Sequence, residues 1–526
     1  MKTKIKKIIC LTAIILLFIS TNATALKMTN ESMIIETEDL DLDLKTIAIK
    51  SLSDKNEDLD PLIDLELTVL IKEIRAFDEI DLFSDPDFYI KIIVNNQNYK
   101  SNVWYNQKVV KEQWQKTVDV PDDQEYINIT IQLWDWNLGK DVLCDIAKND
   151  NGNLNRYDLN IIYNLKTGHW FGDDNSEGSS SWSPDYSGYG RGNGCDDNSI
   201  YEKDRDCEIW FDIFQNDYDG DGIPYWTEVN KYHTDPEVDD RGRDDDGDLV
   251  PIEWEHKWGQ YLRYDYHTHT VKPDWFYDPF TFENHSNLDP DLDSISNVEE
   301  YLTSKWNSDP FRKDVFVELD EMDSGPNGEP KSDLPDNSKE LMYKAFNRQN
   351  IVLHIDDGNM GGGETIPFDN VGEKTDMDEI NDIYYNYFLQ GDENNWRRGV
   401  FHYGLVLYSS VSASGFAFRS NAFQVSTAGL DLKATRIGTR DRDVVYASAY
   451  MHELGHTLGL TWLGGHYEDG KYPWNIAWWI WRPYKSIMNY GYMYGYIHKL
   501  VDFSDGSRGK NDFDDWSNID YSYFET

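Results

Sequence analysis

A strongly acidic segment in the middle of the chain limits what this protein can fold into. Between Asp196 and His256 there are 21 acidic and 5 basic residues, and the whole chain of 526 residues has a formal net charge of -47 at pH 7. Carboxylates at this density repel one another, so a compact fold of the segment requires bound cations. Hydrophobic residues make up 39% of the chain, which is enough to build cores elsewhere and argues against disorder. A chain this acidic is not expected to bind nucleic acid.

The acidic segment contains the spacing of a calcium-binding loop. From Asp217 to Glu228, carboxylates occupy loop positions one, three, five and twelve, and Gly222 occupies position six. The short side chains converge on one ion, a backbone carbonyl at position seven adds an oxygen, and the distant glutamate closes the shell. The predicted Ca²⁺ ligands of this first loop are Asp217, Asp219, Asp221, Ile223 and Glu228.

Two later stretches repeat this spacing. Leu249 in the second loop and Ser294 in the third replace the usual glycine, so weaker binding or altered geometry is expected there. The predicted Ca²⁺ ligands are Asp244, Asp246, Asp248 and Glu255 in the second loop, and Asp289, Asp291, Asp293 and Glu300 in the third. The loops resemble the thrombospondin type 3-like calcium repeats of extracellular prokaryotic proteins, more than a pair of helix-flanked EF-hands. The alternative is a solvated acidic linker.

A different motif, His452-Glu453-Leu454-Gly455-His456, predicts a catalytic metal site near the C-terminus. Two histidines four residues apart on a helix lie one turn above the other, so both imidazoles can reach one ion. Glu453 is then placed to take a proton from a metal-bound water. Residues 443–450 predict the beginning of this helix, and Gly459 stands where a helix that must stop and turn would place glycine.

Together with the downstream sequence Ser486-Ile487-Met488-Asn489-Tyr490, the motif resembles the metzincin zinc peptidases. Their pattern is H-E-x-x-H-x-x-G-x-x-H followed by a methionine-containing turn, and the resemblance covers roughly the last third of the chain. It implies one catalytic Zn²⁺ with Glu453 as general base, and Met488 as a hydrophobic floor under the ligands. Tyr490 matches a tyrosine that approaches the metal in such relatives, with core packing as its alternative role.

The chain departs from the metzincin pattern at the third zinc ligand. That ligand would fall at Trp462, and tryptophan cannot bind zinc. His466 and Asp469 lie just downstream among glycines that allow a tight reversal, so either could supply the ligand. Imidazole is the commoner zinc ligand, which favours His466. His354, His402 and His498 are expected to be structural.

The sequence before the acidic segment predicts export and a β domain. Lysines before the apolar run 8–19, and a small-residue cleavage site ending at Ala25, predict a signal peptide (1–25), with an uncleaved anchor as the alternative. A polar acidic segment (26–60) follows. Strands over 65–71, 88–94 and 126–135, with Ser84–Tyr89 and Trp134–Asn137, resemble C2 domains, so residues 61–165 are expected to form a C2-like sandwich.

The remaining boundaries follow from composition and periodicity. Residues 166–212 read as a Ser/Gly/Asp-rich linker in which Cys195 and Cys207 could form a disulfide, residues 213–312 as the calcium loops with little regular structure, and residues 313–526 as an α/β (α+β) catalytic domain. In that domain we expect strands over 314–319, 351–355 and 401–408, a helix over 338–348, and an edge strand within 416–425.

The chain is therefore interpreted as a multidomain, secreted or cell-surface, calcium-stabilised zinc endopeptidase that acts on a protein or peptide substrate. The alternative is a non-catalytic calcium-binding surface or adhesion protein whose peptidase domain is degenerate. A C2-like domain would also permit membrane contact, although the overall acidity opposes binding to anionic lipid unless calcium bridges the two.

Overall fold

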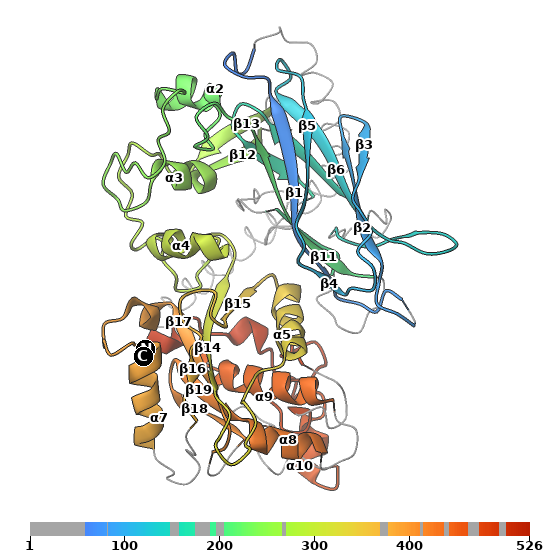
Figure 1. Ribbon diagram of the computed structural model, residues 1–526, viewed down its shortest axis with the longest axis vertical. Helices are drawn as coiled ribbons and strands as arrows, with labels where there is room; N and C mark the ends of the chain where they lie inside the picture. Colours follow the sequence, from blue (N-terminus) through green and yellow to red (C-terminus); the bar gives the residue numbers. More distant parts are fainter. Residues whose placement is uncertain are drawn as a thin grey trace, which may run out of the picture.

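In the computed structural model an antiparallel β-sandwich, a row of acidic repeats and an α/β unit follow one another along the chain (Figure 1). The structure describes residues 58–81, 83–147, 157–173, 190–195, 205–265, 270–368, 377–410, 414–435, 441–460, 466, 473–493 and 501–525. The predicted signal peptide, most of the 26–60 segment, Trp462, Asp469 and His498 lie outside these residues. Within them, no helix combines the length and apolar character needed to cross a bilayer.

The sandwich consists of two antiparallel sheets around one apolar core. The first sheet has the order β10-β11-β1-β4 with β5 also on β1: β1 (Glu66–Ala76), β4 (Val109–Val110), β5 (Trp114–Asp119), β10 (Gly190–Asn193) and β11 (Cys207–Gln215). The second has the order β3-β2-β6-β8-β9 with β7 on β6: β2 (Phe88–Val94), β3 (Gln97–Lys100), β6 (Tyr126–Asp135), β7 (Val142–Leu143), β8 (Leu159–Asn164) and β9 (His169–Gly172). The three predicted strands are confirmed as β1, β2 and β6.

The segment predicted as a linker contributes to this sandwich. β11 pairs with β1 from Leu67↔Gln215 to Ala76↔Cys207, and β9 and β10 also fall within 166–212. The linker prediction was wrong at this end of the segment. It followed the high content of Ser, Gly and Asp in the middle, although Cys207–Gln215 has the alternating pattern of a strand. The disulfide suggested for Cys195 and Cys207 is not formed: none of Cys144, Cys195 and Cys207 takes part in a disulfide, and the thiol beside Cys207 is that of Cys144.

The acidic repeats contain more regular structure than expected. Each calcium-type loop leads into a short helix: α2 (Tyr225–Thr227) with the turn η1 (Glu228–Tyr232), then α3 (Ile252–Gly259), then α4 (Asn297–Thr303) with η2 (Ser304–Trp306). A hairpin of β12 (Gln260–Asp265) and β13 (Thr270–Trp275) is inserted after the second helix. The closing glutamate of each loop lies at or within its helix, so the loop spacing itself places a helical turn there.

The C-terminal unit is built on a mostly parallel sheet with the order β15-β14-β17-β19-β18 and β16 beside β14. Its strands are β14 (Asp314–Met322), β15 (Val352–Asp356), β16 (Thr365–Ile366), β17 (Phe401–Leu407), β18 (Gly415–Arg419) and β19 (Ala422–Ser426). Its helices are α5 (Asp336–Arg348), α7 (Met377–Ile383) with η3 (Tyr384–Phe388), α8 (Thr427–Thr435), α9 (Arg442–Thr457) and α10 (Ile476–Trp481), with the short turns η4 (Trp396–Gly399), η7 (Trp516–Asn518) and η8 (Tyr523–Glu525).

The elements predicted in this unit are confirmed, with one difference at the edge. The predicted strand within 416–425 is a hairpin, because the chain turns at Ser420 and Asn421. β18 runs antiparallel to β19, and among the described residues β19 is its only strand partner. β18 is therefore the open edge of the sheet.

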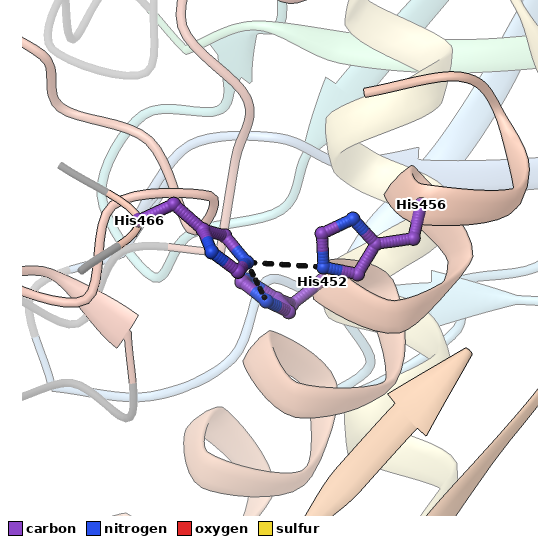
Figure 2. Close-up of side chains that lie close together, drawn as sticks. All are labelled: His452, His456 and His466. Atoms are coloured by element: carbon purple, nitrogen blue, oxygen red, sulfur yellow. Dashed lines mark hydrogen bonds between the residues drawn. The ribbon is translucent and has the colours of Figure 1, made fainter. Parts of the chain in front are cut away.

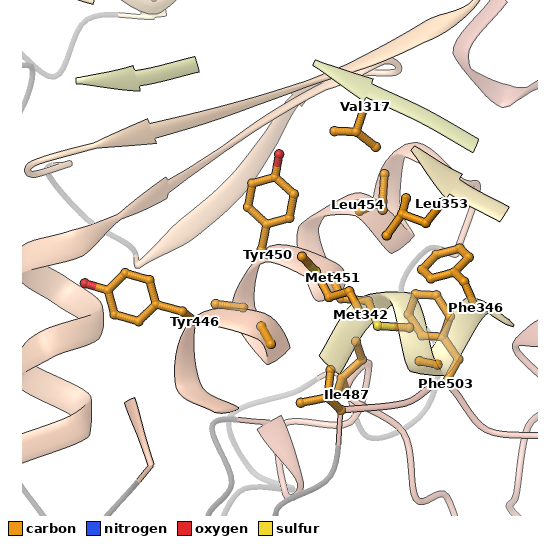
Figure 3. Packing of buried hydrophobic residues seen from close by; sticks show 14 of the residues in the cluster. Val317, Met342, Phe346, Leu353, Tyr446, Tyr450, Met451, Leu454, Ile487 and Phe503 are labelled. Carbon is orange, nitrogen blue, oxygen red and sulfur yellow. The ribbon is translucent and has the colours of Figure 1, made fainter. Parts of the chain in front are cut away.

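Helix α9 passes through the centre of the C-terminal unit. Every residue from Val444 to Gly455 is buried, so the helix is enclosed on all sides rather than amphipathic. It packs beside α5 and over the sheet, where Leu454 joins Val317 and Leu353 (Figure 3). Each large apolar side chain buried in this way contributes about 1.5–3 kcal/mol to folding, so the helix is held rigidly where its last turn carries the H-E-x-x-H motif.

Candidate active site and cation sites

The two histidines of α9 present the same ring atom to one point. Nδ1 of His452 lies 2.8 Å from the carbonyl oxygen of Ile487, and Nδ1 of His456 lies 2.8 Å from that of Leu460. A carbonyl only accepts hydrogen bonds, so each Nδ1 carries the proton and each Nε2 has a free lone pair. Carbonyl partners of this kind fix the orientation of metal-binding imidazoles.

His466 completes a group of three. Its Nε2 lies 3.2 Å from Nε2 of His452 and 3.0 Å from Nε2 of His456 (Figure 2). A tetrahedral zinc with Zn–N bonds near 2.0–2.1 Å holds its nitrogen ligands about 3.3 Å apart. One N–H on His466 could serve only one of the two lone pairs, whereas a cation satisfies all three nitrogens. The residues therefore fit Zn²⁺, and the structure places His466 where a third ligand would lie, beside His452 and His456. Asp469, the rival, lies outside the described residues.

Gly459 explains how the helix ends where the second histidine needs it. Its φ of 78° is left-handed, and the N–H of Leu460 donates to the carbonyl oxygen of Gly455 at 2.9 Å. This closing turn reverses the chain so that the Leu460 carbonyl faces His456. A side chain at 459 would be strained and would also approach Asp520.

Glu453 lies between the histidines in sequence and faces the edge strand. It is buried, and burial raises the pKa of its carboxyl group to about 8, partly offset by a hydrogen bond from the backbone of Ala417 in β18. A Cβ atom at Gly415 would come within 2.7 Å of Glu453 Oε1, so glycine at the beginning of β18 lets the edge strand approach the carboxylate. The candidate base and the open edge of the sheet are therefore direct neighbours.

The methionine turn packs against helix α9 and beside two of the three imidazoles. Met488 is buried, and its sulfur would be 2.8 Å from a Cβ at Gly455, so this glycine lets the turn approach the helix. The ring of Tyr490 lies 5.6 Å from that of His452 and 4.6 Å from that of His466, centroid to centroid. Met488 thus packs against α9 at Gly455, and Tyr490 lies against two candidate ligands.

Two of the histidines expected to be structural have structural environments. Nε2 of His354 lies 2.5 Å from Asp314 Oδ1, and its ring stacks on Phe316. His402 is buried on β17 beside Phe524, and burial lowers its pKa to about 3. Neither residue lies in the His452, His456 and His466 group.

The three acidic loops share one backbone geometry. Position six is left-handed in each, with φ of 90° at Gly222, 85° at Leu249 and 72° at Ser294. The first aspartate of each loop, Asp217, Asp244 or Asp289, accepts the backbone N–H of position six. The two non-glycine residues therefore adopt the conformation that the loop requires, and the predicted alteration of loop geometry is not seen.

A fifth carboxylate, which was not among the predicted ligands, completes each repeat. The backbone N–H of Asp240, Glu283 and Asp314 donates to the position-five aspartates Asp221, Asp248 and Asp293, at 3.2, 3.3 and 2.7 Å. Asp221, Glu228 and Asp240 form one group that could hold a cation, and Asp248, Glu255 and Glu283 belong to another. The signal was present in the sequence, because Asp-Pro-x-x-x-Asp/Glu ends at Asp240, Glu283 and Asp314.

The closing glutamates are buried among like charges. Burial first, and the neighbouring aspartates second, raise the pKa of Glu228 to about 8 and that of Glu255 to about 9. The same causes raise the pKa of Glu300 well above its ordinary value. Buried carboxylates with such neighbours are destabilising unless a cation or a proton compensates them, so the repeats are suited to divalent ions.

The aspartates of the C2-type pieces have other partners. Oδ1 of Asp135 accepts the backbone N–H of Asp87, Oδ2 of Asp141 accepts the Tyr89 hydroxyl, and Asp85 pairs with Lys108. Although the resemblance to C2 calcium loops would make Asp85, Asp87, Asp135 and Asp141 candidate calcium ligands, these contacts also fit a structural role in the turns.

Comparison with known proteins adds little at the level of family. No known protein-family profile matches the chain. No curated protein matches it either. Among solved structures, one C2 domain matches 28% of this chain and 97% of its own, at 12% identity and a TM-score of 0.16. A C2 domain of plant extended synaptotagmin 1 matches 28% of this chain and 94% of its own, at 13% identity and a TM-score of 0.17.

A larger protein is similar over the same share of this chain. Human GIVD cytosolic phospholipase A2 matches 28% of this chain but only 17% of its own, at 14% identity and a TM-score of 0.16. The antiparallel sandwich is established by its own strand pairing, and its finer C2 assignment stays a prediction.

Proposed function

We propose that this protein is a secreted, calcium-stabilised zinc endopeptidase of the metzincin type. One observation carries the proposal: Nε2 of His466 lies 3.2 Å from Nε2 of His452 and 3.0 Å from Nε2 of His456, beside a buried glutamate. The carbonyl partners of His452 and His456, the glycine turn after α9 and the methionine under Gly455 add support. The C2-like character of the sandwich belongs to the same proposal.

His452, His456 and His466 would hold the metal, which when bound supplies a water of lowered pKa and a positive charge for a developing oxyanion. Glu453 accepts the proton of the attacking water and passes it to the leaving amine, and its burial keeps bulk water from competing for that proton. Tyr490, beside His452 and His466, is available as a hydrogen-bond donor to the oxyanion.

The substrate is proposed to bind as an extended strand along β18. The free edge of an antiparallel strand offers backbone N–H and C=O groups to a peptide, and β18 lies directly over Glu453. Such pairing would hold the scissile carbonyl near the base without selecting one particular side chain. Cleavage of unstructured peptides is therefore expected before cleavage of compact domains.

The test combines metal content with activity. Elemental mass spectrometry on the secreted protein in calcium is expected to find zinc, with about one equivalent per chain lost in His466→Ala and none lost in Asp469→Ala. Glu453→Gln is expected to keep the zinc and to lose peptidase activity on an unfolded protein substrate by at least ~100-fold. Glu237→Gln, an exposed acid in the repeats, is the matched control.

Each result has a distinct meaning. Zinc lost in Asp469→Ala but kept in His466→Ala would assign the third ligand to Asp469. No zinc in the wild type, with several calcium ions still bound, would refute the peptidase proposal in favour of a non-catalytic surface or adhesion protein.

A further inference from the structure

The second acidic repeat contains a buried histidine that the other two lack. His285 follows Glu283 by two residues, whereas Gly242 and Phe316 occupy the equivalent positions after Asp240 and Asp314. The side chain of His285 is fully buried. At this position, a nitrogen donor is thus present in one repeat only.

His285 meets three carboxylates at one point. Asp248, Glu255, Glu283 and His285 each offer a ligand atom, and these four atoms lie within 4.8 Å of one another. Nε2 of His285 is 3.2 Å from Asp248 Oδ2 and 3.9 Å from Glu255 Oε1. Neither His285 Nε2 nor Glu255 Oε1 forms a hydrogen bond with any described residue, although both atoms are shielded from water. A buried nitrogen and a buried carboxylate oxygen that lie 3.9 Å apart, both without a hydrogen bond, fit a cation bound between them.

The opposite side of the imidazole is held by neutral groups. Nδ1 of His285 lies 2.9 Å from the side-chain amide of Asn297, which also contacts the Tyr277 hydroxyl at 2.9 Å. The rings of Tyr277 and Trp254 lie edge-on against His285, with centroids 4.7 and 5.6 Å away. It is Nδ2 of Asn297 that faces Nδ1, while the buried Oδ1 of Asn297 has no hydrogen-bond partner among the described residues. With the amide oxygen and nitrogen exchanged, Oδ1 accepts Nδ1–H, and the Nε2 lone pair of His285 then points at the carboxylates.

We infer that Asp248, Glu255, Glu283 and His285 form a binding site for a divalent transition metal ion, separate from the His452, His456 and His466 centre. Calcium takes oxygen ligands almost exclusively, whereas imidazole is a ligand for zinc, cobalt, nickel and related ions. Three carboxylates and one imidazole therefore favour a transition metal over Ca²⁺ at this repeat. The first repeat offers only oxygen, with Asp221, Glu228 and Asp240, and remains a calcium site.

The ion would fasten the inserted part of the repeat. Asp248 and Glu255 precede the β12–β13 hairpin in the chain, and Glu283 and His285 follow it. One ion bound by all four closes the loop that contains this hairpin. Its loss would loosen the hairpin without removing the calcium ions of the first repeat.

The test uses the full-length chain with His452→Ala and His456→Ala, so that the proposed catalytic centre does not contribute. In millimolar calcium, titration with Co²⁺ is expected to show about one tight equivalent, with ligand-field absorption bands of a nitrogen-containing site. His285→Ala and the longer-reaching His285→Gln are expected to weaken Co²⁺ binding by at least ~10-fold and to shift those bands. Calcium content should not change.

Two controls separate a ligand from a packing residue. His233→Ala removes an exposed histidine of the first repeat, whose Nδ1 contacts the carbonyl of Val229, and should leave Co²⁺ binding unchanged. Glu283→Gln removes a carboxylate but no buried ring, and should weaken Co²⁺ binding as His285→Gln does. The inference is overturned if calcium displaces Co²⁺ from the double variant, or if the His285 and Glu283 variants bind Co²⁺ as tightly as their parent.

Discussion

At the scale of single residues, the acidic loops depend on backbone conformation as much as on charge. Gly222 and Leu249 occupy the same left-handed position in the first and second loops, with φ of 90° and 85°. For a residue with a Cβ atom, this conformation lowers the stability of the folded state by about 1–2 kcal/mol. Gly222 avoids this strain, and Leu249 does not. Leu249 is 60% exposed, so little packing compensates it.

This difference predicts opposite effects of two substitutions. In saturating calcium, Gly222→Ala should lower the free energy of unfolding by about 1 kcal/mol, although no atom lies close enough to clash. Leu249→Gly should raise it by about 0.5–1 kcal/mol, because relief of strain exceeds the added freedom of the unfolded chain. Denaturant midpoints measure both. Gly139→Ala, at an open position without left-handed φ, is the control. Changes of the same sign in the first two variants would contradict the prediction.

His402 should make the stability of the protein depend on pH. Burial lowers the pKa of His402 to about 3 from an ordinary value of 6.5, so the unfolded chain binds its proton first as the pH falls. Stability is then fully present above pH 6.5 and is lost by up to about 1.4 kcal/mol per pH unit below it. His402→Phe should flatten this slope in thermal melts between pH 7 and 5. An unchanged slope would show that His402 is not the group responsible.

At the scale of elements, the acidic repeats should be the most metal-dependent part of the molecule. Each repeat places a buried glutamate on or at the beginning of its helix, with aspartates around it. A site filled to 100 times its dissociation constant adds about 2.7 kcal/mol to stability, and several such sites add more than one zinc site does. Removal of calcium should therefore lower Tm more than removal of zinc with phenanthroline. Scanning calorimetry on the two samples tests this, and an equal or smaller shift without calcium would refute a structural role.

At the scale of the whole molecule, buried charges connect the sandwich to the α/β unit. Glu208 of β11 accepts hydrogen bonds from Arg75, Arg191 and Asn347, at 3.3, 3.0 and 3.0 Å, and Asn347 belongs to α5. Burial acts to raise the pKa of Glu208, but the two guanidinium groups bring it below its ordinary value. Arg75 also pairs with Glu340 of α5 at 2.9 Å. The sandwich is thus fixed to the helix that packs beside α9.

Loss of this connection should separate the unfolding of the two units. Glu208→Gln leaves two buried guanidinium groups without their shared anion, and we expect a loss of about 3–5 kcal/mol. Calorimetry should show one transition divided into two. Lys111→Ala, which removes an exposed partner of Glu340, should cost no more than about 1 kcal/mol. A Glu208→Gln effect as small as that of Lys111→Ala would show that the network does not couple the units.

Local spacing determined a large part of this protein from the sequence. The helix carrying His452 and His456 and the three acidic loops follow from residue types a fixed number of positions apart, and the strands β1, β2, β6, β14 and β17 follow from their apolar patterns. Such features depend on contacts between near neighbours in the chain, whose geometry the backbone fixes. The Asp-Pro-x-x-x-Asp/Glu pattern is also visible in the sequence, but the sequence does not predict that its last residue contacts the position-five aspartate of the loop.

The tertiary structure decided what local spacing could not express. The meeting of His466 with His452 and His456, the approach of β18 to Glu453, and the placement of β11 in the sandwich all depend on how distant segments pack. The same holds for Glu283 and His285. They lie near Asp248 and Glu255 because the antiparallel β12–β13 hairpin between them reverses the direction of the chain. Sequence distance is a poor guide to such contacts, because packing of the core rather than local geometry brings their partners together.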